Sequence, residues 1–277
     1  YYFNGESDYP GLGNVINAGK AKRISLTDGF PTFVPESFMA DSVTYTRTFR
    51  RGCDGLENKY NWSTIILPFD VQRVSILPDS IDVDWFHNAD ELGKDFWLCS
   101  YHGKENYTLL FDYSDEFLAN TPYIITVSDE RIDGPGLVGK PIAFSATDAE
   151  VKAGTLFIDT NDFDVEGNYS GGTVTGSHLY VMDEENYEKD FTYVGDTVTA
   201  VPFRAYITSE VSPNDNNKQL FIKLLHENPE MTGIQHVMEI PSPSNNDVYD
   251  MMGRKMIGNY MLNKGIFIIN KKKFVVK

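Results

Sequence analysis

Short stretches rich in Val, Ile, Thr, Tyr and Phe recur about every ten residues along the chain, and Gly, Pro, Asn or Asp residues bound each of them. This pattern is typical of an antiparallel all-β protein. The strands that it predicts are Val43–Phe49, Ser63–Phe69, Phe96–Tyr101, Tyr107–Tyr113, Tyr123–Val127, Ile142–Ala146, Leu156–Ile158, Leu179–Met182, Phe191–Val194, Phe203–Thr208 and Leu220–Leu225.

Alternation within the segment Val43–Phe49 indicates a strand with one buried face. Its odd positions carry the bulky side chains and its even positions are all Thr, so one face can pack while the other meets solvent. The two short helical candidates, Ser114–Ala119 and Asp183–Lys189, are interpreted as connections between strands. We therefore expect an antiparallel β-sandwich, or two packed sandwiches that divide near Gly154.

Composition along the chain predicts three regions. Residues 1–40 are expected to form an N-terminal extension and first turn region, because the first 20 contain four Gly and little periodicity. Residues 41–235 are expected to form the sandwich body. Residues 236–277 begin with a linker rich in Pro and Ser and are expected to end in a small β tail.

Charge and hydropathy exclude several classes of partner. The chain has 277 residues, 41% of them hydrophobic, and a formal net charge of −16 with a pI near 4.6. Such a field repels phosphate backbones and anionic headgroups, so we expect no nucleic-acid partner. The longest apolar runs, such as Ile65–Leu67, are far shorter than the roughly 20 residues of a membrane-spanning helix, so we expect no membrane insertion.

Two cysteines, Cys53 and Cys99, are too few for a disulfide framework or a structural zinc site. The sequence leaves open whether they pair.

The C-terminal segment contains the stretches DVYDMMGRK at 247–255, LNKGIFIIN at 262–270 and KKFVVK at 272–277. Together these stretches resemble the tails of exported Bacteroidetes proteins. In that lineage such endings belong to C-terminal sorting domains, which are longer than this tail. The resemblance covers about 31 residues. It implies an extracellular or outer cell-surface location.

The body contains the stretches LTDG at 26–29, VTYTRTF at 43–49, WSTIILPF at 62–69, TPYII at 121–125 and FRAY at 203–206. Together these stretches resemble a module of Bacteroides and Prevotella surface proteins. That module has no assigned reaction, so the resemblance implies a cell-surface β module and supplies no catalytic residues.

One acidic segment has spacing suited to a calcium ion. Asp162, Asp164 and Glu166 place carboxylates at alternate positions before Gly167, as in loops that wrap around Ca²⁺. The twelfth position is Thr173 instead of a bidentate Glu. A plain acidic turn is therefore the alternative interpretation, and no other cofactor is expected.

An aromatic residue among acids is the best candidate for a sugar contact. Trp85 lies beside Asp82 and Asp84 in a polar stretch, whereas Trp62 and Trp97 lie within or next to apolar strands and are expected in the core. The numerous carboxylate pairs and the five His show no spacing that fixes a catalytic pair or a metal site.

These patterns together favour a non-enzymatic cell-surface or secreted binding or adhesion module whose ligand is a glycan or an extracellular protein. One alternative is a carbohydrate-active hydrolase or its accessory domain, which would need two close carboxyls in an aromatic-lined cleft. The other is a structural spacer of a larger surface protein.

Overall fold

The computed structural model is described in two units. Contacts divide the chain into Tyr1–Leu225 and His226–Lys277. Within the described residues, no helix has the length and apolar character needed to cross a membrane. The residues that the structure describes are 1–5, 9, 12–52, 61–83, 85–86, 95–128, 130–131, 134–154, 157–160, 163–182, 190–213, 218–225, 248–250, 255–256, 265–269 and 272–276.

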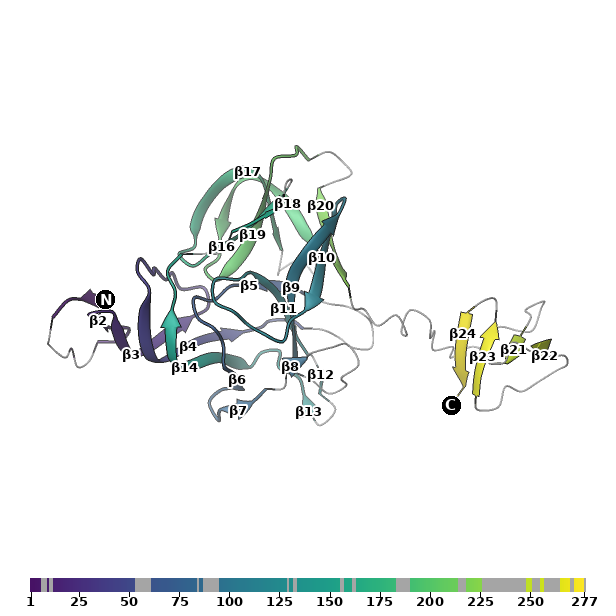
Figure 1. Ribbon diagram of the computed structural model, residues 1–277, viewed down its shortest axis with the longest axis horizontal. Helices are drawn as coiled ribbons and strands as arrows, with labels where there is room; N and C mark the ends of the chain where they lie inside the picture. The colour runs from purple at the N-terminus through teal and green to yellow at the C-terminus, as the bar shows by residue number, and fades with distance from the viewer. Residues whose placement is uncertain are drawn as a thin grey trace. The chain divides into compact units, whose positions relative to one another are not determined.

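The first unit contains a seven-stranded sheet with the order β1-β2-β3-β4-β14-β6-β7 (Figure 1). Its centre is the long antiparallel pair β4–β14, whose facing apolar positions alternate with polar ones. The strands are β1 (Tyr2–Phe3), β2 (Ile16–Asn17), β3 (Lys20–Thr27), β4 (Phe38–Thr48), β14 (Pro141–Val151), β6 (Arg73–Ile76) and β7 (Ile81–Asp82).

A second sheet of eleven strands has the order β15-β16-β19-β17-β18-β20-β10-β9-β11-β5, with β8 beside β9. A separate pair joins β12 (Glu130–Arg131) to β13 (Gly134–Pro135). The strands of the second sheet are β15 (Phe157–Thr160), β16 (Phe163–Asn168), β19 (Arg204–Ser209), β17 (Gly172–Met182), β18 (Phe191–Ala200), β20 (Gln219–Leu224), β10 (Thr108–Tyr113), β9 (Phe96–Glu105), β11 (Tyr123–Val127), β5 (Ser63–Ile65) and β8 (Trp85–Phe86).

The prediction of an all-β protein is confirmed, but the prediction of purely antiparallel sheets is wrong. Strand β3 runs parallel to β4, and β10 runs parallel to β20. The alternation of apolar and polar positions is the same in parallel and antiparallel strands, so it carries no information on strand direction. Both sheets are mixed.

Strands β5, β9 and β11 lie between two hydrophobic cores. In Figure 1 these three strands are seen between the pair β4–β14 and the strands β16–β20. On β11, Ile125 packs into the core shared with the first sheet and Ile124 packs into the core beneath β16–β20. All five residues of β11 are buried for this reason. A strand covered on both faces needs apolar side chains on both faces, which explains the unbroken apolar run YII at its start.

The second sheet curls so that β5, at one end of the strand order, lies beside β19. The Thr64 hydroxyl donates to the carbonyl oxygen of Ala205 at 3.1 Å and accepts from the Ala205 N–H at 2.9 Å. The Ile66 N–H donates to the Phe203 carbonyl at 3.2 Å. These bonds satisfy backbone groups that would otherwise be unpaired at a sheet edge.

The predicted N-terminal extension over residues 1–40 is wrong. Three strands of the first sheet lie wholly in this segment, and Ile24 and Leu26 of β3 belong to the core. The Gly residues of the first 20 positions interrupt the alternation of apolar and polar residues before β3 begins. For this reason the sequence pattern did not indicate that the segment belongs to the body. The segment is part of the folded body.

The second sheet crosses the position near Gly154 that the sequence left as a possible subdivision. The second sheet takes β5, β9, β10 and β11 from before this residue and β15–β20 from after it. Strand β16 had no counterpart in the sequence prediction, because its Asp and Glu residues depress the strand signal. The division between the two units falls after Leu225, whereas the predicted boundary at 236 and the linker lie outside the described residues.

The second unit contains a sheet with the order β22-β21-β23-β24 in which neighbouring strands are antiparallel. Its strands are β21 (Val248–Asp250), β22 (Lys255–Met256), β23 (Gly265–Ile269) and β24 (Lys272–Val276).

Candidate functional site

A pocket of about 550 Å³ lies in the first unit where the two sheets meet. Its walls come from the turn after β3, the end of β4, the start of β5, and the adjoining ends of β17, β18 and β19. This volume is within the range of about 300–1,000 Å³ that small-molecule sites occupy. The pocket is therefore the main candidate site in the described part of the chain.

Arg47 forms the buried end of the pocket. Its position on the apolar face of β4, in register with Val43 and Tyr45, places the side chain between the sheets, where it is 2% exposed. Its guanidinium donates from Nη1 to the Thr64 carbonyl at 3.1 Å and from Nη2 to the Ser63 hydroxyl at 2.8 Å. A buried cation is tolerated only with such partners.

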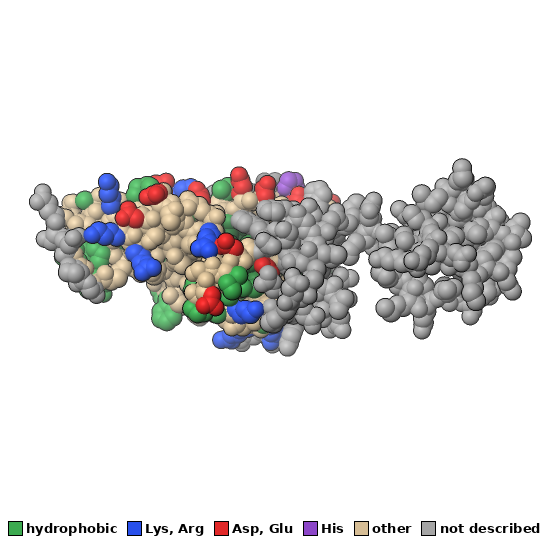
Figure 2. Space-filling model, turned by 90° about the horizontal axis from the view of Figure 1, so that it is seen from below, with side chains coloured by type: hydrophobic (Ala, Val, Ile, Leu, Met, Phe, Trp, Pro, Cys, Tyr) green, Lys and Arg blue, Asp and Glu red, His purple; other side chains and the backbone are tan. Residues whose placement is uncertain are grey.

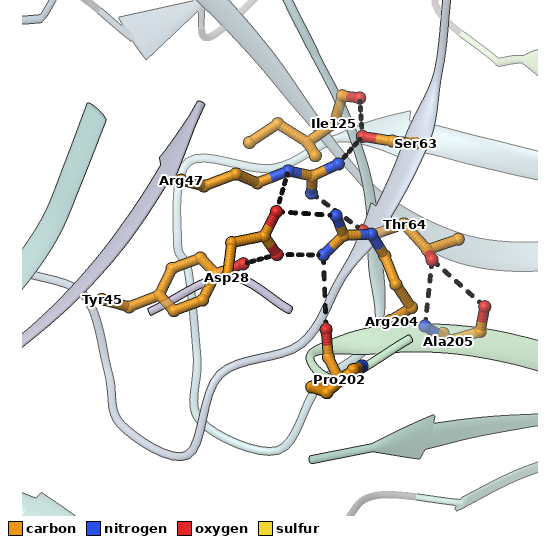
Figure 3. A network of polar contacts seen from close by, with 9 residues as sticks. All are labelled: Asp28, Tyr45, Arg47, Ser63, Thr64, Ile125, Pro202, Arg204 and Ala205. Atoms are coloured by element: carbon orange, nitrogen blue, oxygen red, sulfur yellow. Dashed lines mark hydrogen bonds and ion pairs between the residues drawn. The ribbon is translucent and has the colours of Figure 1, made fainter. Parts of the chain in front are cut away.

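Asp28 joins Arg47 to a second arginine from the other sheet (Figure 3). Arg204 donates from Nη1 to Asp28 Oδ1 at 2.7 Å and from Nη2 to Oδ2 at 3.1 Å, a two-pronged contact. The Nε of Arg47 lies 3.8 Å from Oδ2, and the Tyr45 hydroxyl donates to Oδ1 at 2.6 Å. One carboxylate thus holds groups from β4 and β19 together.

The arginines keep Asp28 ionised. Burial by itself raises the pKa of this carboxyl, but the hydrogen bonds and charge of Arg204, the charge of Arg47 and the hydrogen bond from Tyr45 together lower it below its ordinary value. Burial also raises the pKa of Tyr45, so its hydroxyl remains a donor to Asp28. The network carries a net positive charge of two arginines against one aspartate.

A strained turn places Arg204. Phe203, just before β19, has a φ of 63°, in the left-handed region that bulky residues rarely adopt. Its N–H donates to the Asn168 carbonyl at 2.7 Å and its side chain is fully buried, so packing holds this backbone in place. The turn therefore positions the Arg204 side chain so that its guanidinium contacts the Asp28 carboxylate.

The mouth of the pocket carries further polar and basic side chains. Arg50 is exposed and Arg51 is half-buried, and both lie two to three residues after the end of β4. The lining also includes Thr48, Asn61 and Thr199, and apolar side chains such as Val198 and the buried Met182. Phe49 lies under the guanidinium of Arg47, whose carbon is 4.3 Å from the ring centre.

The exposed charges elsewhere do not gather in this way on the face drawn in Figure 2. Basic and acidic side chains alternate over its described part, so neither sign forms a large patch there. The pocket lining contains Arg47, Arg50, Arg51 and Arg204, although the total charge of the chain is −16.

Of the residues that the sequence proposed for a sugar contact, Asp82 and Trp85 lie in strands of different sheets. Asp82 is the last residue of β7, is largely exposed and accepts a hydrogen bond from Nε of Arg73. Trp85 belongs to β8, where its backbone pairs with Phe96, and Asp84 lies outside the described residues. Asp82 is not part of the pocket lining, and a ligand role for the three residues stays a prediction.

The acidic segment at 162–166 contains a strand where a ligand loop or turn was expected. Asp164 and Glu166 lie in β16, and Asp162 is outside the described residues. Glu166 accepts hydrogen bonds from the Tyr206 hydroxyl at 2.8 Å and from Thr208 at 3.4 Å. Among the described residues no group of three or more His, Cys, Asp or Glu side chains could hold a metal ion, and calcium binding stays a prediction.

Trp62 and Trp97 were expected in the core. Trp62 is 4% exposed and belongs to the second core, and Trp97 packs partly buried against it.

Cys99 is a buried thiol on β9. Burial, and to a smaller extent the charge of Asp112, raises the pKa of that thiol well above its ordinary value. Cys53 lies outside the described residues.

The sequence interpretation missed every member of the arginine network, although one signal was visible. Arg47 occupies an odd, buried-face position in the stretch Val43–Phe49, whose other odd positions carry apolar or aromatic side chains, and its charge therefore requires a partner. The partners Asp28, Thr64 and Arg204 lie in other stretches, LTDG, WSTIILPF and FRAY, that carry the body resemblance. No local pattern connects them, because they are far apart in the chain.

A comparison of this chain with protein-family models, curated proteins and solved structures found no match. Arguments about its function therefore rest on the pocket and on the residues that line it.

Proposed function

We propose that this protein is a non-enzymatic binding module of the outer cell surface or the extracellular space, and that its pocket holds a glycan. The observation that carries the proposal is the pocket of about 550 Å³, where basic, hydroxyl and apolar side chains converge between two rigid sheets. Sites on sheets are well suited to recognition because packing holds their side chains before the ligand arrives.

The lining suits a saccharide in its mixture of groups. Thr48, Thr199 and Asn61 offer hydrogen-bonding partners for sugar hydroxyls, while Val198 and Met182 offer apolar surface for C–H groups. In the binding role, the two mixed sheets serve as a scaffold of the β-sandwich type, with the ligand at their junction.

The state of Asp28 supports binding more than glycoside hydrolysis. A hydrolase needs one carboxyl that stays protonated to donate to the leaving oxygen. Burial raises the pKa of Asp28, but Arg204, Arg47 and Tyr45 together lower it below its ordinary value. An ionised carboxylate with this many donors positions arginines and has no proton to give.

A blocking substitution tests the proposal. Val201 lines the pocket and is 48% exposed, so Val201→Trp should narrow the mouth without disturbing the core. Val194, 40% exposed on β18 and outside the lining, gives the matched control Val194→Trp. Binding of the full chain to a glycan array, followed by calorimetry on each hit, measures the effect.

We expect a reproducible hit whose affinity falls at least about tenfold in Val201→Trp and stays unchanged in Val194→Trp. Hits that respond equally to both variants would place the site elsewhere. An array without hits would argue against glycan binding and favour the structural spacer.

A further inference from the structure

We propose that the glycan is a neutral oligosaccharide of β-1,4-linked glucose units, and that Phe30 and Phe33 stack against the sugar rings that extend beyond the pocket. The inference rests on the proposed function and specifies the kind of sugar and the length of the site. It starts from two phenylalanines that the fold leaves in water beside the pocket.

The loop between β3 and β4 exposes two aromatic side chains. Phe30 is 67% exposed and Phe33 is 77% exposed, whereas Phe38 at the start of β4 is 5% exposed. Every exposed residue from Gly29 to Pro35 is Gly, Phe or Pro. Single exposed apolar residues are common on protein surfaces, but a group of them marks a binding surface. We call Phe30 and Phe33 the aromatic rim.

Hydrogen bonds and packing hold this loop in place. The N–H of Phe30 donates to the Thr27 carbonyl at 3.1 Å and closes a turn. The N–H of Thr32 donates to the Tyr169 carbonyl at 2.9 Å, and Val34 packs partly buried against the core of the first sheet. Because the backbone is fixed at these points, a ligand loses little affinity to the ordering of the loop.

The loop is continuous with the wall of the pocket. Gly29 lines the pocket and directly precedes the first exposed ring. Nη1 of Arg204 donates to Asp28 Oδ1 at 2.7 Å and to the Pro202 carbonyl at 3.5 Å, so the turn after β3 and the turn after β18 lie side by side (Figure 3). Val201, next to Pro202 in the chain, also lines the pocket and is 48% exposed. A ligand that leaves the pocket between these turns meets apolar surface.

The area of the aromatic rim decides between a sugar and a protein as its occupant. A phenylalanine side chain buries at most about 150–250 Å², so the rim contributes no more than about 500 Å². A stable protein interface or dimer buries about 800 Å² on each partner. The rim is therefore too small for a protein partner or a second copy of this chain, and it suits a few sugar rings.

The chemistry of the aromatic rim favours glucose in β-linkage. The face of an aromatic ring is negative and attracts the partly positive hydrogens of C–H groups. In a β-1,4-linked glucose unit every hydroxyl and both linkages lie at the ring edge, so each face presents only C–H groups. An axial hydroxyl would be buried against phenylalanine without a partner, at a cost in free energy. A neutral sugar also meets no repulsion from a chain with a net charge of −16.

Probes of different length and linkage test this inference on the full chain. Cellobiose is short enough for the pocket of about 550 Å³ to hold it alone, cellotetraose extends beyond it, and maltotetraose has the same rings in α-linkage. Phe30→Ala and Phe33→Ala each remove one ring. Phe30→Tyr keeps the ring, and Phe30→Leu keeps an apolar side chain without a ring. Calorimetry measures each affinity, and circular dichroism melting establishes that each variant is folded.

The matched control is Phe221→Ala. Phe221 is 46% exposed on β20 and lies outside the pocket lining, so the substitution removes an exposed ring away from the proposed site.

We expect cellotetraose to bind at least about tenfold more tightly than cellobiose or maltotetraose. Phe30→Ala and Phe33→Ala should each weaken cellotetraose binding by about 3- to 10-fold and leave cellobiose binding within about twofold. Phe30→Tyr should bind like the unmodified protein and Phe30→Leu like Phe30→Ala. Phe221→Ala should change neither affinity.

Other outcomes overturn the inference in distinguishable ways. Equal binding of cellobiose and cellotetraose, abolished by Val201→Trp, would leave the glycan-binding pocket standing and remove the aromatic rim from the site. Array hits confined to other sugars would remove the preference for β-linked glucose. No binding of any saccharide would overturn both proposals.

Two further measurements test the other occupants. A dimer in sedimentation experiments that Phe30→Ala dissociates would assign the aromatic rim to a second copy of the chain. Binding to phosphatidylcholine vesicles that Phe30→Ala and Phe33→Ala abolish would assign it to a membrane surface. Either result would overturn the inference.

Discussion

Two aspartate–arginine contacts in the first unit use the same chemistry in different surroundings. In the pocket network the side chains of Asp28, Arg204 and Arg47 are 24%, 12% and 2% exposed. In the pair at the edge of the first sheet, Asp82 and Arg73 are 74% and 51% exposed. Because the first contact is more buried, water screens it less than it screens the second pair.

The difference lies in what each contact does for the fold. Removing an exposed partner leaves the other group in water, at little cost. Removing a member of the buried network leaves a charge or a backbone carbonyl without a partner in a medium of low dielectric constant. The network links β4, β5, β19 and the turn after β3, whereas the exposed pair links β6 to β7 within one sheet.

Arg47→Met should produce the largest effect on stability. The substitution fills a similar volume but leaves the Thr64 carbonyl and the Ser63 hydroxyl without the guanidinium, and removes one counter-charge from Asp28. We expect the free energy of unfolding to fall by about 3–5 kcal/mol, measured by urea denaturation of the full chain. A loss below 1 kcal/mol would mean that the buried and exposed contacts are energetically alike.

Asp28→Asn should have a smaller effect that depends on pH. Because the pKa of Asp28 is lowered in the folded state, its ionised form stabilises the protein above the unfolded-state pKa of about 3.9, and this stabilisation is lost as pH falls through the lower folded-state pKa. We expect a loss of about 2–3 kcal/mol at pH 7. The difference from the unmodified protein should shrink between about pH 5 and pH 2.

Urea denaturation at a series of pH values measures this effect, with Asp82→Asn as the control. A difference that stays constant across the acid range would mean that the charge of Asp28 contributes nothing to stability.

The exposed pair should produce the smallest effect. Asp82→Asn and Arg73→Met should each change the free energy of unfolding by about 0–1 kcal/mol, because both side chains keep access to water. Thermal unfolding at about 20 mM and 500 mM salt should show that even this contribution declines with screening. A change as large as that of Arg47→Met would remove the distinction between the two contacts.

Local pattern predicted much of the secondary structure. Tyr123–Val127 is predicted and observed with identical bounds, and Val43–Phe49 lies almost wholly within the longer β4. In both segments the apolar side chains either alternate with polar ones or run continuously. Such a pattern depends only on whether one face or both faces of the strand are buried. Strand β16 escaped the prediction because Asp164 and Glu166 make it resemble an acidic turn.

The candidate site could not be predicted in the same way. The pocket needs Asp28 after β3, Arg47 on β4 and Arg204 on β19, and the hydrogen bonds between Asp28 and Arg204 span 176 positions of sequence. The parallel pairing of β3 with β4 brings the first two together, and alternation does not specify strand direction.

Three properties of this chain could be derived from its sequence alone: that it folds as β-strands, which of their faces are apolar, and that its charge is strongly acidic. Each of these properties follows from the order of residues within a few positions or from simple composition. Three other features are visible only in the folded molecule: the mixed sheets, the burial of β11 between two cores, and the presence of several arginines at one pocket. Those features arise from contacts between distant strands, whose pairing depends on the packing of the whole core and not on any single segment.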